Sequence, residues 1–144
     1  MENLKFGSSS KENEFKTQID ANLVLDMFIP VVTMSEMNVF GHWSVRYKRF
    51  KEQKARILAK WQEEKIKISI PCHVLMIRVA PRAMDDDNLR GALKACRDII
   101  ADIIIPNKSA GHADSSPLIV WEYHQEKRQP KIYGLHVKIY EIPK

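Results

Sequence analysis

The chain has 144 residues, of which 44% are hydrophobic and 28% charged, as is usual for one soluble globular domain. No apolar run approaches the roughly 20 residues of a membrane span, and the first residues lack the pattern of a signal peptide, so we expect a cytoplasmic protein without membrane contact. The formal net charge of +5 favours a polyanionic partner such as DNA.

The cysteines and histidines point to no redox or zinc chemistry. Cys72 and Cys96 are the only two cysteines, and they form no CxxC pair. One lies in an expected strand and the other on the apolar side of an expected helix, so both should be core residues. The five histidines show no paired spacing typical of zinc ligands.

The N-terminal part divides into an arm and a first strand. Residues 1–20 are polar and are predicted to form a flexible arm, which leaves 21–144 as the single folded domain. From Asn22 to Ile29 large apolar residues alternate with others, which predicts a strand that Pro30 ends.

A basic amphipathic helix is predicted from Trp43 to Glu64. Its apolar residues recur at spacings of three, four and seven: Tyr47, Phe50, Ile57, Leu58 and Trp61. Basic residues crowd its other faces, and those expected to contact DNA phosphates are Arg46, Arg49, Lys51 and Lys54. A solvated helix usually mixes charges of both signs, so phosphate contact is a fair inference; a basic face that serves only solubility is the alternative.

A second strand and a second helix surround an acidic cluster. The strand is expected from Lys67 to Ala80, and it should be central because both of its faces become apolar near its end. The helix is expected from Asp87 to Ile104, with a core stripe of Leu89, Ala92, Leu93, Cys96, Ile99, Ile100 and Ile103. Arg90, Lys94 and Arg97 form a basic stripe beside the cluster, and Arg90 and Arg97 are expected to contact DNA.

The C-terminal part is predicted to be a loop and a hairpin. Pro106 ends the second helix, and residues 107–116 form a polar loop that contains Asp114. Strands are expected at 118–124 and 131–141, paired as a hairpin with a basic tip. The resulting order β-α-β-α-β-β predicts an α/β (α+β) domain with a mixed sheet and two main helices.

The acidic cluster, Asp85-Asp86-Asp87-Asn88, suggests a Mg²⁺ site. Residues two apart in an extended segment point the same way, so Asp85 and Asp87 can share a pocket, and Asp114 can join them from its loop. Such a metal would assist hydrolysis of a phosphodiester. The alternative is helix capping, which aspartate favours and which fits Asp86 best; Asp98 and Asp102 are expected to be solvated helix residues, paired with Lys94 or Arg97.

Together these features resemble the RusA family of Holliday junction resolvases, in particular its phage-encoded branch. The D-x-D-N-L string is matched by Asp85, Asp87, Asn88 and Leu89, and the helix from Arg90 to Asp98 follows it. Upstream, the chain resembles the family at Pro30, Ser35, Asn38, His42, Trp43, Arg46 and Arg49. Downstream it resembles the family at Asp114, at 121–123 and at 131–139, so the likeness spans about residues 22–142.

The resemblance implies a homodimeric, Mg²⁺-dependent endonuclease that cuts four-way DNA junctions symmetrically in recombination and repair. It assigns Asp85, Asp87 and Asp114 as catalytic metal ligands and Asn88 as the residue that supports them. Family members often carry a lysine where this chain has Gly91, and Lys94, one turn further, is the possible substitute.

Two other functions are compatible with the sequence. One is a protein of the same fold that binds branched DNA but no longer cleaves it. Gly91 and Asp114, which has no acidic neighbour in the chain, would favour this function. The other is a metal-dependent nuclease that acts on flaps or other branched DNA.

Overall fold

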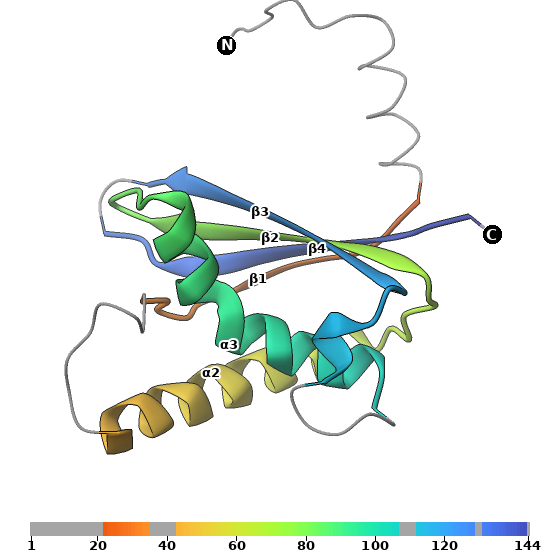
Figure 1. The fold of residues 1–144 in the computed structure, drawn as a ribbon, viewed down its shortest axis with the longest axis horizontal. Helices are drawn as coiled ribbons and strands as arrows, with labels where there is room; N and C mark the ends of the chain where they lie inside the picture. Colours follow the sequence, from red (N-terminus) through yellow and green to blue (C-terminus); the bar gives the residue numbers. More distant parts are fainter. Residues whose placement is uncertain (1–21, 35–42, 107–111, 129–130, 144) are drawn as a thin grey trace, which may run out of the picture.

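The computed structural model describes residues 22–34, 43–106, 112–128 and 131–143 (Figure 1). Its elements, in chain order, are β1 (Leu23–Ile29), α2 (Trp43–Glu64), β2 (Cys72–Ala80), α3 (Asp86–Ile104), the 3₁₀ turn η1 (Ala113–Ser115), β3 (Ile119–Lys127) and β4 (Gly134–Glu141). This is a single mixed α+β domain in the predicted order β-α-β-α-β-β. The predicted arm at 1–20 lies outside the described residues, as do Ser35, Asn38 and His42.

The four strands form one mixed sheet in the order β1-β4-β2-β3. Strand β4 runs antiparallel to both β1 and β2, whereas β3 runs parallel to β2. The predicted hairpin between the last two strands is therefore wrong, because β2 lies between them. A parallel neighbour needs a long crossover, and α3 supplies it from β2 to β3. Alternation of apolar residues shows that a strand exists but does not identify its partner.

Strand β2 is central, as predicted, but it is shorter than expected. It begins at Cys72 rather than Lys67. Pro71 has no backbone N–H with which to continue a ladder. On the side of β3, the first backbone contact is from Cys72 N to Leu118 O at 2.9 Å. The apolar residues that precede it, Ile66 and Ile68, pack against the core from a loop.

The two helices cover one face of the sheet, and the main core lies between them and the strands (Figure 1). Helix α3 buries the predicted stripe, although Ile103 is only partly buried and Ala101 is buried in addition. On the other face of β2, His73, Leu75 and Ile77 are half-buried, and no described helix covers them. The strand is therefore central in the sheet but not enclosed on both faces.

Helix α2 has the predicted bounds, but it packs over only part of its length. Its buried residues are Gln53 and Ile57. Gln53 Nε2 donates to Val32 O at 3.0 Å and Arg56 Nη1 donates to Pro30 O at 2.9 Å, which fastens the middle of α2 to the segment after β1. The first turns extend beyond this anchor, and Tyr47, predicted as part of the apolar stripe, is 56% exposed.

Among the described residues, no helix is both long and apolar enough to cross a membrane.

Candidate nucleic-acid and metal site

A buried arginine fixes the turn that leads to the acidic cluster. Arg78, near the end of β2, is only 8% exposed, and burial lowers its pKa. Its Nη1 donates to the carbonyl of Arg82 at 2.8 Å and its Nε donates to Thr33 Oγ1 at 3.2 Å. A buried guanidinium with unsatisfied donors is costly, so these contacts hold the turn after β2 and the segment after β1 together.

A glutamine from β3 fixes the same turn from the other side. Gln125 Oε1 accepts from Met84 N at 3.0 Å, and its Nε2 donates to Met84 O at 2.6 Å. The two bonds clamp both backbone groups of the residue just before the cluster. The head of α3 is thus supported by two neighbouring strands, β2 and β3, which is the kind of rigid support that a reactive site requires.

Asp85 is the N-cap of α3. Its backbone is extended, and its Oδ1 accepts from Asn88 N at 2.9 Å. The cap is therefore Asp85 and not Asp86, and the helix begins one residue earlier than predicted. Asp86 and Asp87 both lie in the first helical turn and are exposed. Because that turn is helical, the alternation of an extended segment does not place Asp85 and Asp87 on one side.

Asp114 lies beside the middle of α3, not beside its head. Its carboxylate Oδ2 is 3.3 Å from Arg97 Nε, an ion-pair contact without hydrogen-bond geometry, and 3.8 Å from Lys94 Nζ. Its backbone carbonyl accepts from Arg97 Nη2 at 3.0 Å and from Trp121 Nε1 at 3.1 Å. Lys94 and Arg97 follow Asp87 by about 10 to 15 Å of helix. The structure therefore does not bring Asp114 together with the cluster.

Asp98 joins the charged group around Asp114. Lys94 Nζ lies 3.3 Å from its carboxylate, which confirms one of the predicted pairings. The prediction that Asp98 and Asp102 are solvated is wrong, because both are half-buried. Burial is the main reason that the pKa of Asp98 is raised; Asp114 also raises it, whereas Lys94 lowers it. Two acids, Asp98 and Asp114, and two bases, Lys94 and Arg97, thus lie together beside the middle of α3. Such a group balances its own charge, so it needs no metal.

The head of α3 fits Mg²⁺ in part. Exposed carboxylates at Asp85 and Asp87, completed by water and a substrate phosphate, are a ligand set that Mg²⁺ accepts. Within the described residues, however, no three acidic, histidine or cysteine side chains are grouped so that they could hold one ion. The three-carboxylate set expected from Asp85, Asp87 and Asp114 is not assembled in this structure.

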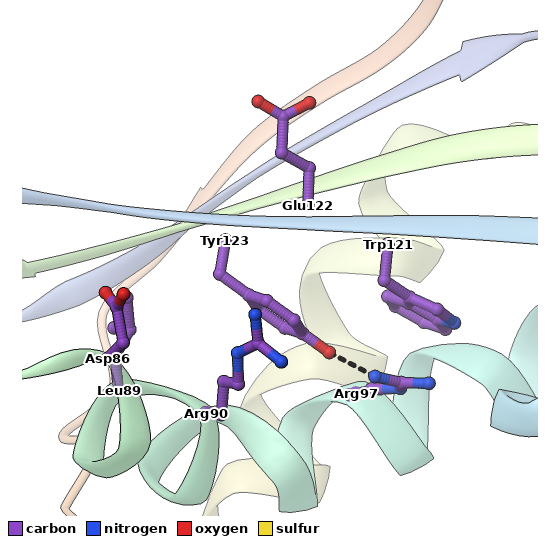
Figure 2. A pocket seen from close by; sticks show the side chains of 7 residues that line it. All are labelled: Asp86, Leu89, Arg90, Arg97, Trp121, Glu122 and Tyr123. Carbon is purple, nitrogen blue, oxygen red and sulfur yellow. Dashed lines mark hydrogen bonds between the residues drawn. The ribbon is translucent and has the colours of Figure 1, made fainter.

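A cavity of about 530 Å³ opens between α3 and β3, next to the acidic cluster (Figure 2). It is lined by Asp86, Leu89, Arg90, Arg97, Trp121, Glu122 and Tyr123. Trp121 and Tyr123 point from β3 toward the helix, whereas Glu122 points away (Figure 2). Arg97 lies 4.9 Å from the Trp121 ring centre and donates to the Tyr123 hydroxyl, and Arg90 lies 5.9 Å from the Tyr123 ring centre.

The basic residues predicted to contact DNA differ in their surroundings. Lys51, Lys54 and Arg90 are exposed, as is Arg46, which also has an interaction within the protein. Arg49 is half-buried and likewise has a protein partner. Arg97 donates to two protein groups and lies over the Trp121 ring, so in this structure it organises the site.

The cysteines are core residues, as predicted. Cys72 and Cys96 are free and fully buried. Burial raises the pKa of Cys72 to about 11, with a contribution from Glu141, and that of Cys96 to about 12. Both are therefore thiols at neutral pH and unsuited to nucleophilic chemistry.

Sequence reasoning missed the roles of Arg78, Gln125, Trp121 and Tyr123. An arginine inside the apolar run of β2 was a usable signal, because a buried guanidinium needs partners. The two aromatic residues alternate along β3 and so had to share a face, but which element faces them depends on the sheet order.

The fold and this site define a mixed α+β protein that presents an acid-capped helix beside an arginine and aromatic cavity. Comparison with protein-family models found no match, and no curated protein or solved structure matches the chain.

Proposed function

We propose that this chain is a Mg²⁺-dependent, structure-specific endodeoxyribonuclease that resolves four-way DNA junctions, similar to the RusA family. The observation that carries the proposal is the D-x-D-N-L string at the head of α3. Its first residue, Asp85, caps the helix, and the preceding turn is held by Arg78 and Gln125. Carboxylates on so firm a support can bind an ion reproducibly.

Different residues of the chain have different roles in the proposed reaction. Asp85 and Asp87 would hold the ion, which when bound activates water and stabilises charge on the scissile phosphate. Asn88 is half-buried, and its backbone N–H donates to the Asp85 carboxylate and so orients it. The exposed cations of α2 bind the DNA backbone, and both helices begin toward the same end of the molecule (Figure 1).

The biological setting is part of the same proposal. A resolvase cuts two strands symmetrically, so we propose that the protein acts as a homodimer, in the cytoplasm, in recombination and repair. Sedimentation should show a dimer. A monomer that still made paired nicks would remove the dimer from the proposal.

The test is cleavage of a synthetic four-way junction with and without Mg²⁺. We expect paired nicks in Mg²⁺, none in EDTA, and at least a hundredfold loss in Asp87→Asn with DNA binding retained. Glu63→Gln, which removes one exposed acid at the far end of α2, is the matched control and should nick normally. Undiminished nicking by Asp87→Asn would refute the catalytic assignment.

A second function is favoured by the position of Asp114. This residue pairs with Arg97 and Lys94 instead of facing the cluster, which suits a protein that binds branched DNA without cutting it. That function predicts junction binding that weakens with salt and no metal-dependent product on any branched substrate. Comparing junction, flap and linear duplex in the same assay separates it from a junction resolvase and from a nuclease of other branched DNA.

A further inference from the structure

The cavity between α3 and β3 has the chemistry of a nucleotide site. We propose that it binds one unstacked nucleotide, with its base against the ring of Tyr123, beside Trp121, and its phosphate at Arg90. Its source would be a DNA strand, which rests on the proposed function. The ligand is then a nucleotide at a branch or in a single strand, because paired bases in a duplex keep their faces covered.

The aromatic wall is held in a fixed orientation. Trp121 is fixed by the bond from its Nε1 to the Asp114 carbonyl, at 3.1 Å. Tyr123 is fixed at its hydroxyl, which accepts from Arg97. A platform whose rings are already oriented loses little conformational freedom when a base stacks on it, so more of the stacking energy appears as affinity.

Positive charge flanks the wall without being neutralised by it. Arg90 is exposed on the helix side, 5.9 Å from the Tyr123 ring centre, and among the described residues it forms no ion pair. A guanidinium there can donate to a phosphate while its plane lies near the base. Arg97 lies deeper and is occupied with protein groups, so it shapes the wall instead.

The size and position of the cavity suit one nucleotide beside the acidic cluster. Its volume of about 530 Å³ lies within the range of small-molecule sites, roughly 300 to 1,000 Å³. Asp86 lines it, directly between Asp85 and Asp87 in the chain. A nucleotide in the cavity would therefore place a neighbouring phosphodiester near the predicted metal ligands and would influence where the strand is cut.

Binding of a fluorescent oligothymidylate, and of a blunt duplex of equal length, tests the proposal by anisotropy in EDTA. Tyr123→Leu should weaken single-strand binding about fivefold or more, the least that stacking of one base contributes. Tyr123→Phe keeps the ring and should bind much more tightly than Tyr123→Leu. Arg90→Gln should weaken binding and make the negative slope of log K against log salt less steep by about 0.7, the value for one phosphate contact on a single strand.

Lys67→Gln, which removes one exposed charge outside the cavity, is the matched control for Arg90→Gln. Thermal melting verifies that each variant folds. Equal binding by Tyr123→Leu, Tyr123→Phe and wild type, or by Arg90→Gln and Lys67→Gln, would overturn the proposal. A different result would be that thymidine 5′-monophosphate displaces the oligonucleotide when its concentration is similar to that of the nucleotides in the oligonucleotide. That result would overturn the proposal that the bound nucleotide belongs to a DNA strand and would assign the cavity to free nucleotides.

The outcome is independent of cleavage, because EDTA removes the metal. A wild-type protein that never nicks junctions but shows these losses keeps the nucleotide site and loses the nuclease function. A protein that nicks normally but shows no losses keeps the nuclease function and loses the nucleotide site.

Discussion

Asp85 combines two roles that can be separated by substitution. As the N-cap it accepts from Asn88 N, and as part of the D-x-D-N-L string it is a predicted metal ligand. Capping needs only a short side chain with an acceptor oxygen, and asparagine caps about as well as aspartate. A metal ligand of this kind needs the negative charge.

We therefore expect two variants of this residue to separate the two roles. Asp85→Ala should lower the free energy of unfolding by about 1 kcal/mol because the cap is lost. Asp85→Asn should melt within about 2 °C of wild type and still lose Mg²⁺-dependent nicking. Thermal denaturation and junction nicking measure the two effects. Normal nicking by Asp85→Asn would make this residue a cap only.

Asp98 should make stability depend on pH in an identifiable direction. Its pKa is raised, first by burial and then by Asp114, although Lys94 opposes the shift. When the pKa of a carboxyl is higher in the folded state than in the unfolded chain, its ionisation lowers the free energy of unfolding. This penalty is absent below its ordinary pKa of 3.8 and complete above the raised value.

Asp98→Asn should accordingly unfold at a higher temperature than wild type at pH 7, and the difference should close near pH 3. Lys94→Gln should do the reverse at pH 7, because it removes the cation that favours the Asp98 carboxylate. Melting curves across this pH range measure both effects. A less stable Asp98→Asn at pH 7 would mean that the contact with Lys94 outweighs the cost of burial.

At the scale of elements, periodicity predicted most of the fold but not its pairing. Helix α2 and strand β1 were predicted almost residue for residue, because the apolar residues of each recur with a clear period in the sequence. The order of the strands left no such trace, since β4 alternates in the same way whether its neighbour is β3 or β2. The hairpin prediction failed for this reason.

The candidate site was predictable only where it is local. The cap and the string lie in one short stretch, so the sequence located them at the head of a helix. The cavity requires β3 to pass over α3, and the charged group requires Asp114 to return to mid-helix. Both depend on contacts between distant residues, and chain spacing alone cannot predict them.

A glycine of β4 lies beneath an aromatic ring of β1. A Cβ added at Gly134 would lie 2.1 Å from Cζ of Phe28, so the ring occupies the space of the missing side chain. Gly134→Ala should displace the ring into solvent and destabilise the protein by about 1 to 3 kcal/mol. Urea denaturation measures the change.

A double-mutant cycle isolates this contact. In a Phe28→Ala background the ring is absent, so Gly134→Ala should cost much less. Gly91→Ala is the matched control within α3, and it should raise stability by up to about 1 kcal/mol because alanine favours helix. Equal costs of Gly134→Ala in both backgrounds would mean that the backbone, and not the ring, requires glycine.

At the scale of the whole molecule, the question is whether the net charge of +5 or its placement on α2 attracts DNA. Lys51 and Lys54 are exposed on the middle of α2, beyond the turns that carry Trp43 and Tyr47. Lys65 and Lys67 are also exposed but follow the other end of the helix. Neutralising either pair gives the same net charge, so any difference between them reports placement.

We expect Lys51→Gln/Lys54→Gln to make the negative slope of log K against log salt less steep by about 1.8, the value for two phosphate contacts on duplex DNA. Lys65→Gln/Lys67→Gln should leave that slope within about 0.5 of wild type, because charges that contact no phosphate release no counterions. Anisotropy titrations of a four-way junction in EDTA at several salt concentrations measure both. Equal slopes for the two double variants would show that overall charge draws the protein to DNA, and the assignment of α2 as the DNA-binding element would fall with it.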